Sequence, residues 1–217
     1  MRELGGVPLE QVTLELGGAP LRLWRATALE RFVDVDALLR AAEPPEPPYW
    51  MHLWPGALAL ARLLATLPGL GTGTRVLELG CGLGLPAVIA ARRGARVVAS
   101  DRACAPLAVV ERSAADNGCA VACVQMDWTH PALRGGFDLC LGADVGYDRA
   151  AEASLAAALA ALLRPGGTAW LADSVNVART TLQAALSAAG LAVRVETRRE
   201  SEDGRPVFVR LIEARRR

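Results

Sequence analysis

From residue 76 to residue 84 the chain reads Val-Leu-Glu-Leu-Gly-Cys-Gly-Leu-Gly (Val76–Gly84), an apolar run that ends in the pattern E-x-G-x-G-x-G. A second apolar run, Val97–Ser100, ends in Asp101. The first run predicts a buried strand, and the glycines after it lack a Cβ, so the backbone can lie against a ligand. The carboxylate of Asp101 is suited to both hydroxyls of a ribose. The pair predicts a site for a nucleoside-containing cofactor.

Segments with strand and helix patterns alternate on both sides of this stretch. Apolar runs predict strands over residues 75–79, 96–100, 120–125, 137–142, 168–172, 192–198 and 207–214. Helices are predicted over residues 54–67, 85–93, 105–116, 151–163 and 177–189, with a turn at 164–167. The last two strands are joined by a polar turn at 202–206, so they must be antiparallel neighbours. The predicted fold class is α/β: a Rossmann-like seven-stranded sheet, mostly parallel with a C-terminal antiparallel hairpin, and helices on both faces.

The first 48 residues predict a small appendage and a connector. Alternating residues over 12–16 and 21–25 predict a β-hairpin around Gly17-Gly18-Ala19-Pro20. A capping-box pattern at 27–30 then opens a helical segment. The expected division is therefore an N-terminal hairpin and helical appendage over 1–43, a Pro-rich connector over 44–48, and the main domain over 49–217.

Composition limits the classes of function. The chain has 217 residues, 52% of them hydrophobic, and a formal net charge of +1, which gives no broad attraction to nucleic acid or to an anionic membrane. It has no run of eighteen apolar residues and no signal sequence, so we expect a cytoplasmic protein. We also expect a monomer. The five cysteines, odd in number and scattered, and the two histidines show no metal-ligand spacing, so no metal site is expected. All the basic residues other than histidine are arginine.

Two kinds of cofactor compete for the glycine-rich loop. The run Gly82-x-Gly84-x-x-Ala87 also fits a looser dinucleotide fingerprint. A nicotinamide-binding domain would normally continue through a second βαβ half, whereas this chain is predicted to end in a hairpin. The C-terminal hairpin therefore favours a methyltransferase.

Four motifs carry a resemblance to a known family. They are Pro48-Tyr49-Trp50-Met51-His52-Leu53-Trp54-Pro55, the loop Glu78–Gly84, Asp127-Trp128, and Asp144-Val145-Gly146-Tyr147. Together they resemble the class I, seven-β-strand S-adenosylmethionine-dependent methyltransferases. Within that class they resemble the methyltransferase-like protein-lysine methyltransferases that act on chaperones, elongation factors and the electron-transfer flavoprotein β subunit. The resemblance implies S-adenosylmethionine as cofactor and S-adenosylhomocysteine as product.

The resemblance also implies roles for the cofactor-binding residues. Gly80, Gly82 and Gly84 would pass under the methionine moiety, and Glu78 would organise the loop or meet the cofactor's ammonium through water. Asp101 would hold the ribose. The remaining expected contacts are Asp127 to the adenine amino group, Trp128 flanking the ring, Trp54 near the amino-acid end, and Arg102 and Ala143 beside these residues.

The expected acceptor residues are Asp144 and Tyr147. A lysine must lose its proton, which has a pKa near 10.4, before it can attack a methyl group. Asp144 would orient the amine and Tyr147 would line the acceptor channel. Asp173, at the end of a later strand, is a further candidate. A capped loop with a buried tyrosine is the plain structural alternative for the first two residues.

Three functions remain open on the sequence alone. The first is methylation of lysine side chains in a protein substrate. The second is methylation of the amine or hydroxyl of a small molecule, and the third is a non-catalytic cofactor-binding protein. Neither nucleic acid nor a membrane is expected as a partner. Substrate choice would fall to the N-terminal hairpin, the loop at 144–149 and the C-terminal hairpin.

Overall fold

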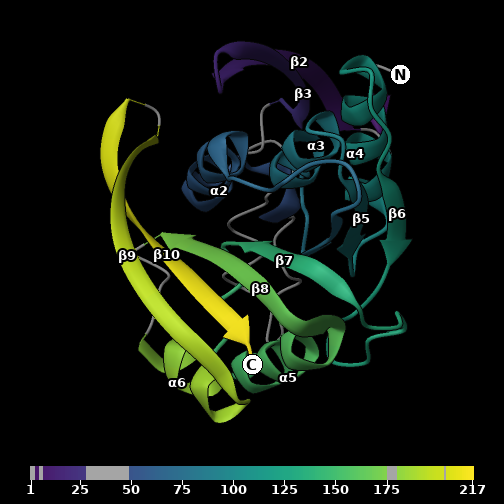
Figure 1. The fold of residues 1–217 in the computed structure, drawn as a ribbon. Coiled ribbons are helices and arrows are strands. Elements are labelled where there is room, and N and C mark those ends of the chain that lie inside the picture. The colour runs from purple at the N-terminus through teal and green to yellow at the C-terminus, as the bar shows by residue number, and fades with distance from the viewer. Residues whose placement is uncertain (1–2, 5–6, 28–48, 175–179, 203) are drawn as a thin grey trace, which may run out of the picture.

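A seven-stranded sheet forms the centre of the molecule in this computed structural model, which describes residues 3–4, 7–27, 49–174, 180–202 and 204–217. Its strands are β4 (Arg75–Leu79), β5 (Arg96–Asp101), β6 (Ala122–Gln125), β7 (Phe137–Ala143), β8 (Leu163–Ser174), β9 (Leu191–Glu202) and β10 (Arg205–Arg216). They lie in the order β6-β5-β4-β7-β8-β10-β9 (Figure 1). The first five are parallel, and β10 runs antiparallel to both β8 and β9. The predicted fold class is confirmed.

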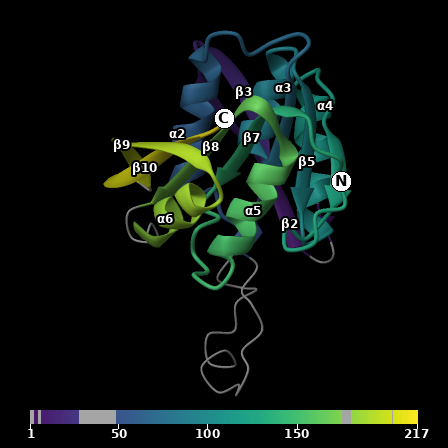
Figure 2. The same cartoon turned by 60° about the horizontal axis from the view of Figure 1, so that its bottom comes forward.

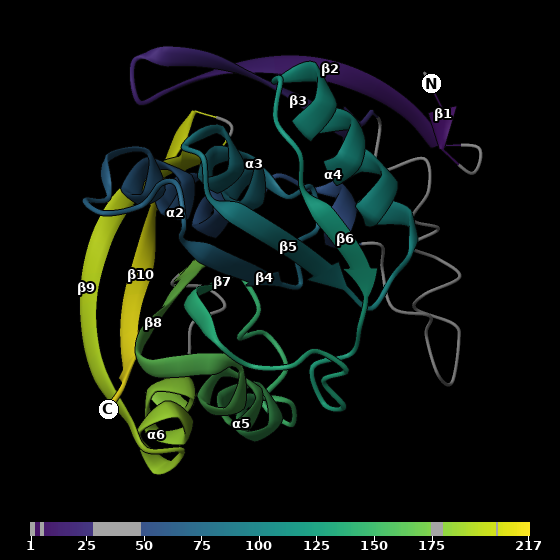
Figure 3. The same ribbon diagram turned by 45° about the vertical axis from the view of Figure 1, so that its right-hand side comes forward.

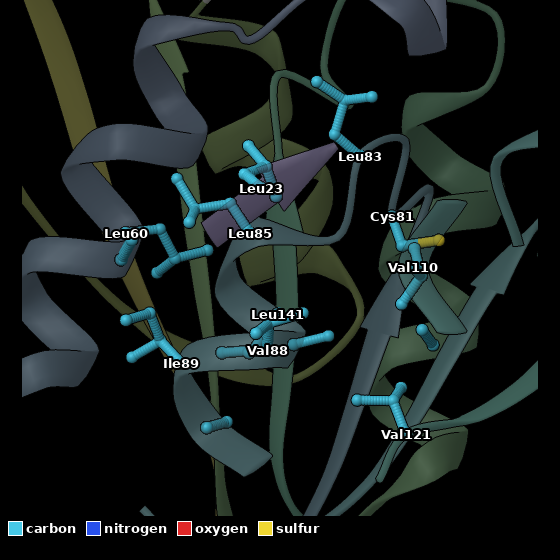
Figure 4. Packing of buried hydrophobic residues seen from close by; sticks show 14 of the residues in the cluster. Leu23, Leu60, Cys81, Leu83, Leu85, Val88, Ile89, Val110, Val121 and Leu141 are labelled. Atoms are coloured by element: carbon cyan, nitrogen blue, oxygen red, sulfur yellow. The ribbon is translucent and has the colours of Figure 1, made fainter. Parts of the chain in front are cut away.

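Helices cover both faces of the sheet (Figures 1 and 2). The helices on one face are α2 (Pro55–Thr66), α3 (Leu85–Arg92) and α4 (Ala105–Asp116), and those on the other are α5 (Glu152–Leu162) and α6 (Thr180–Ala188). Each face has its own apolar core. Leu60, Val88 and Leu141 belong to the core under α2 to α4 (Figure 4), and Leu159 and Leu162 belong to the core under α5. Burial of these side chains stabilises the sheet from both sides.

The N-terminal strands form a separate small sheet that packs on the first helical face. Its strands are β1 (Glu3–Leu4), β2 (Val7–Leu16) and β3 (Ala19–Ala26), so the predicted hairpin is present and longer than expected. The hairpin lies across α3 and α4 (Figure 3). Leu23 is fully buried and packs in the same core as Leu60 and Leu85 (Figure 4). The predicted helix and connector of residues 28–48 lie outside the described residues, and the domain division stays a prediction.

Polar contacts fasten the hairpin to α4. The indole N–H of Trp24 donates to Asp116 Oδ2 at 2.7 Å, and the guanidinium of Arg112 lies 4.7 Å from the centre of the Trp24 ring. The backbone N–H of Arg22 donates to Asn117 Oδ1 at 3.0 Å, and Asn117 Nδ2 donates back to the Arg22 carbonyl at 2.6 Å. The side-chain amide of Asn117 thus pairs with the backbone of Arg22 in the way that the backbone of a neighbouring strand would.

Two turns differ from their prediction. Residues 164–167 were expected to separate α5 from the next strand, but β8 already begins at Leu163. Phe137 pairs with Leu163 and Leu139 with Thr168, so the Arg-Pro-Gly-Gly segment is an irregularity within the strand pairing. The C-terminal turn is tighter than the predicted 202–206, because Arg205 already pairs with Glu202. Of the helix predicted from residue 177, the described part begins at Thr180.

The described residues also bear on membranes, metals and disulfides. None of the helices in the described ranges has the length and apolar character needed to cross a bilayer. Within the same ranges, no three histidine, cysteine or acidic side chains gather as a metal site. All five cysteines, at 81, 104, 119, 123 and 140, are free thiols.

Candidate functional site

A cavity of about 300 Å³ opens at the carboxyl ends of β4, β5 and β7. Open α/β sheets place ligand sites at this edge. The cavity is lined by parts of the segments 49–54, 80–85, 101–103 and 143–147, together with Ala57 and Trp128. Of the predicted site residues, the cavity brings together Trp54, Gly80, Gly82, Gly84, Asp101, Arg102, Trp128, Ala143, Asp144 and Tyr147. Glu78 and Asp127 are not among its lining residues.

The glycine-rich loop has a backbone that favours glycine at three positions. Gly80, Gly82 and Gly84 have φ angles of +61°, +49° and +69°. A Cβ on Gly80 would lie 3.0 Å from Val145 Cγ1 and 3.1 Å from the Trp128 ring. Glycine therefore lets the loop pass under Trp128 at the edge of the cavity.

Gly84→Ala is expected to destabilise the protein much more than Gly118→Ala. Both glycines have a φ of +69°, so both substitutions carry the left-handed penalty of about 1–2 kcal/mol. A Cβ on Gly84 would lie 2.4 Å from Val110 Cγ2, whereas nothing lies within 4 Å of one on Gly118. Overpacking adds about 1–3 kcal/mol at Gly84. Urea unfolding of both variants measures the difference, and Val110→Ala in the Gly84→Ala background should recover part of it. Equal losses in the two single variants would contradict the steric argument.

Glu78 supports the loop from below. Its side chain is fully buried, and Oε2 accepts a hydrogen bond from the Ala87 N–H, in the first turn of α3, at 2.8 Å. Oε1 has no protein partner. Burial, with a smaller contribution from the charge of Asp101, raises the pKa of Glu78 to about 8. Glu78 therefore ties β4 to α3, and its predicted contact with the cofactor's ammonium stays a prediction.

Asp101 combines a role in the loop with a place in the cavity. Its Oδ2 accepts from the Gly82 N–H at 3.0 Å and its Oδ1 from the Ala103 N–H at 2.9 Å. Burial raises the pKa of this carboxyl, although the backbone hydrogen bonds oppose the shift. A carboxylate offers about four lone-pair sites, so both oxygens retain capacity for ligand hydroxyls.

Asp127 and Trp128 are adjacent in sequence but differ in placement. Trp128 lines the cavity, and its buried indole N–H has no protein partner. Asp127 is exposed, and its Oδ1 accepts from the backbone N–H of Thr129 at 2.8 Å and from Thr129 Oγ1 at 2.7 Å. These two bonds lower the pKa of Asp127. In this structure Asp127 caps a turn, and the adenine contact predicted for it stays a prediction.

Asp144 lines the cavity and connects three elements of the fold. Its Oδ2 accepts from the Gly56 N–H, at the start of α2, at 2.8 Å. Its Oδ1 accepts from the Ser174 N–H, at the end of β8, at 2.8 Å. Asp144 is the one non-glycine residue in the described ranges with a positive φ, +51°. Burial raises the pKa of its carboxyl. The carboxylate is therefore held rigidly where β7 ends.

Asp173 lies beneath the loop that carries Asp144 and Tyr147. It is 1% exposed and does not line the cavity. Its Oδ1 accepts from the Gly146 N–H at 3.3 Å, and its Oδ2 has no protein partner. Burial, followed by the charge of Asp144, raises the pKa of Asp173 to about 7. Asp173 thus supports the loop, and it does not face the acceptor side of the cavity as the sequence suggested.

The raised pKa values of Glu78 and Asp173 predict a pH dependence of stability. Both carboxyls stay protonated in the folded state up to about 8 and about 7, against ordinary values of 4.5 and 3.8. The folded state therefore binds more protons in that interval, and these groups lower the free energy of unfolding as pH rises through it. We therefore compare the free energy of unfolding of Glu78→Gln with that of the unaltered protein at two pH values. The difference in favour of the variant should be larger at pH 9 than at pH 5, by at least about 1.4 kcal/mol.

Urea unfolding at the two pH values tests this expectation. Asp173→Asn should behave in the same way, with its gain complete near pH 8 because the pKa of Asp173 is lower. Either amide keeps an oxygen for the backbone N–H that the carboxylate now holds. A difference between variant and unaltered protein that is the same at pH 5 and pH 9 would contradict the proposed protonation states.

Aromatic side chains gather at the rim of the cavity next to Asp144. The ring centres of Tyr49 and Tyr147 are 5.6 Å apart, and those of Tyr49 and Trp54 are 6.2 Å apart. The Trp54 indole N–H donates to the Tyr49 carbonyl at 2.8 Å. His52 stacks edge-on against Trp54 at 4.7 Å and contacts Glu202 Oε1 at 3.1 Å. The sequence pointed to Trp54 and Tyr147 but missed Tyr49, although Tyr49 lies within the motif that contains Trp54.

Comparisons of sequence place this chain beside known methyltransferases. Residues 76–167 match a family model described as a methyltransferase domain. The electron transfer flavoprotein beta subunit lysine methyltransferase of Danio rerio is 40% identical over 105 residues, 48% of this chain and 40% of that protein. The histone-arginine methyltransferase METTL23 of Xenopus laevis is 36% identical over 107 residues, 46% of each chain. The match thus spans less than half the length of these curated relatives.

Solved structures share the fold. The magnesium protoporphyrin IX methyltransferase ChlM of Synechocystis PCC 6803 with bound SAM matches with a TM-score of 0.61 and 20% identity, over 74% of this chain and 78% of that chain. The T. thermophilus 16S rRNA N2 G1207 methyltransferase RsmC in complex with AdoMet and guanosine gives a TM-score of 0.68 and 18% identity, over 96% of this chain and 51% of that chain. At these identities the likeness concerns the fold.

Proposed function

Because this chain has the methyltransferase domain and the seven-stranded fold of the class I S-adenosylmethionine-dependent methyltransferases, we propose that it binds S-adenosylmethionine and methylates a nitrogen of a protein side chain, lysine in the first place. One observation carries the proposal. A single cavity is lined both by the glycine-rich loop with Asp101 and by Asp144 with Tyr147. A donor and an acceptor can therefore meet inside it.

The residues on the donor side fit the cofactor. The backbone of Gly80 to Gly84 allows close approach of its amino-acid part, and the Asp101 carboxylate suits the ribose hydroxyls. The Trp128 ring offers a flat apolar surface to the base, and its buried, unpartnered N–H is a donor available to a ligand. When bound, S-adenosylmethionine supplies a methyl group on a sulfonium, and a neutral thioether remains after transfer.

On the acceptor side, the chain must orient an amine, which releases its proton to solvent before the transfer. A new nitrogen–carbon bond forms as the carbon–sulfur bond breaks, and only an unprotonated amine has the lone pair for this step. A carboxylate has about four lone-pair sites, so Asp144 keeps capacity beyond the bonds it accepts from Gly56 and from the backbone and hydroxyl of Ser174. In the proposed mechanism these lone pairs orient the amine and stabilise the positive charge that develops on it.

Methyl-labelled S-adenosylmethionine, incubated with the protein and a cell lysate, tests the proposal. A discrete labelled protein with methyl-lysine in its hydrolysate is the expected result. The chain contains no lysine, so methyl-lysine cannot come from modification of the protein itself. Methyl-arginine in the hydrolysate would move the acceptor to arginine, which the name of the Xenopus laevis relative mentions. Protein incubated without lysate controls for labelling of its own arginines.

Two other outcomes would replace the proposal. Label that appears only in small molecules would assign the chain to metabolite methylation. Binding of S-adenosylhomocysteine without labelling of any acceptor would favour a non-catalytic cofactor-binding protein. Failure to bind S-adenosylhomocysteine at all would remove the methyltransferase function, since a ligand of the native state must raise its thermal stability.

A further inference from the structure

Tyr49, Trp54 and Tyr147 form a continuous aromatic rim, called here the aromatic wall, on the side of the cavity next to Asp144. Tyr49 is 42% exposed and Tyr147 is 39% exposed, which sets them apart from the apolar side chains of the two cores. Large rings left exposed together at a cavity are suited to a ligand that has an apolar part. Part of the surface of the Tyr49 and Tyr147 rings is therefore accessible to a ligand.

The charges around the wall favour a cation. Asp144 lies in the same cavity, and Glu202 reaches the wall through His52, which stacks on Trp54. Arg102, an arginine that also lines the cavity, directly follows Asp101 in the sequence, and its charge acts on the carboxyl of Asp127. Ring faces attract cations, and the attraction grows when the cation is desolvated. The Asp144 carboxylate and the aromatic rings thus both favour binding of a cation.

The spacing of the rings distinguishes between two kinds of cation. A planar guanidinium inserted between two rings needs about 7 Å between them, twice a contact distance of about 3.5 Å. Tyr49 and Tyr147 are 5.6 Å apart with a tilt of 53°, and Tyr49 and Trp54 are 6.2 Å apart with a tilt of 59°. The rings contact one another at an angle, so they leave no slot for a flat group. A narrow alkyl chain with a compact ammonium can lie along them.

We infer that the aromatic wall is the acceptor subsite, where Tyr49 and Tyr147 hold the alkyl chain and ammonium of a linear amine in preference to a guanidinium. The inference rests on the proposed function and adds Tyr49 to the residues that determine specificity. Trp54 acts as a positioning residue, because its indole N–H holds the Tyr49 carbonyl at 2.8 Å. Asp144 meets the ammonium at the inner end of the wall.

Fluorine NMR can observe the wall directly, because Tyr49 and Tyr147 are the only two tyrosines of the chain. Protein labelled with 3-fluorotyrosine should give two resonances, assigned with Tyr49→Phe and Tyr147→Phe. With S-adenosylhomocysteine present, the protein is titrated with n-butylammonium, which matches a lysine side chain, and with 1-methylguanidinium, which matches that of arginine. n-Butanol serves as the uncharged control.

The expected result is a saturable shift of both resonances with n-butylammonium, at a dissociation constant about fivefold or more below that for 1-methylguanidinium or n-butanol. Tyr49→Leu should weaken binding of n-butylammonium about fivefold, observed at the Tyr147 resonance, while Tyr49→Phe retains it. Equal affinity for the three probes, tighter binding of 1-methylguanidinium, or no shift overturns the inference. S-adenosylhomocysteine binding is followed in the same samples, so failure of the wall is distinguished from failure of the proposed function.

Discussion

Asp101→Ala is expected to weaken binding of S-adenosylhomocysteine by more than about 100-fold. Hydrogen bonds to a charged group contribute about 1.5–3 kcal/mol each, so loss of two of them to ribose hydroxyls already accounts for that factor. The substitution also frees the Gly82 N–H, which Asp101 Oδ2 holds at 3.0 Å, and so loosens the glycine-rich loop. Isothermal titration calorimetry of the variant gives the dissociation constant.

Asp127→Ala is the matched control for this experiment. Asp127 is also an aspartate that follows a strand, β6, but its Oδ1 is engaged by Thr129 and it does not line the cavity. If the contacts with Thr129 are the whole role of Asp127, the affinity of the variant for S-adenosylhomocysteine changes by no more than about threefold, less than one charged hydrogen bond. A large loss at Asp127 would restore the predicted adenine contact. If Asp101→Ala binds S-adenosylhomocysteine within fivefold of the normal affinity, Asp101 does not contact the cofactor.

Asp144→Ala is expected to lower the free energy of unfolding by about 2–5 kcal/mol and to abolish methyl transfer. The stability loss follows because the N–H groups of Gly56 and Ser174 lose their acceptor, and a buried unpaired donor costs about 1–3 kcal/mol. Urea unfolding measures this loss, and the labelling assay measures the transfer. A variant as stable as the unaltered protein would contradict the structural role of the carboxylate.

Asp144→Asn separates the two roles of this residue. The amide keeps one oxygen for a backbone N–H and occupies the same volume, and only one of the two N–H groups loses its acceptor, at a cost of about 1–3 kcal/mol. The variant should therefore lose less stability than Asp144→Ala, fold, and bind S-adenosylhomocysteine within about threefold of normal. It has no negative charge to stabilise the developing ammonium, and methyl transfer should fall by about 100-fold or more. Unchanged transfer in a folded Asp144→Asn variant would show that another group orients the amine.

The sequence predicted most accurately those features that depend on neighbouring residues. β4 and α4 have the predicted bounds, because strand 75–79 runs into the glycine-rich loop and helix 105–116 ends at Asn117-Gly118. The positive φ angles of the glycine-rich loop follow from the same local pattern. The irregular start of β8 was missed, because a proline and two glycines indicate a turn, whereas pairing with β7 decides whether the strand continues around it.

The sequence predicted most of the residues that line the site, but not the contacts that hold them in place. The bonds that fix Asp144 come from residues 88 and 30 positions away, and no local pattern specifies such partners. Asp127 is the opposite case. Thr129 lies two residues after it, and an aspartate with such a neighbour commonly caps a turn, so a local signal for its observed role was present. Tyr49 was missed because its contact with Tyr147 depends on the fold.

The attachment of the N-terminal hairpin to α4 constrains the order of events during synthesis. Trp24 donates to Ser113 and Asp116, which lie 89 and 92 residues further along the chain. An isolated two-stranded hairpin is marginally stable in water, and β2 and β3 lack their polar contacts with α4 while the ribosome makes the next ninety or so residues. At about 5–20 residues per second this interval lasts roughly 5–20 seconds. Leu21 and Leu23, fully buried in the finished molecule, therefore depend for their burial on helices that are made after them.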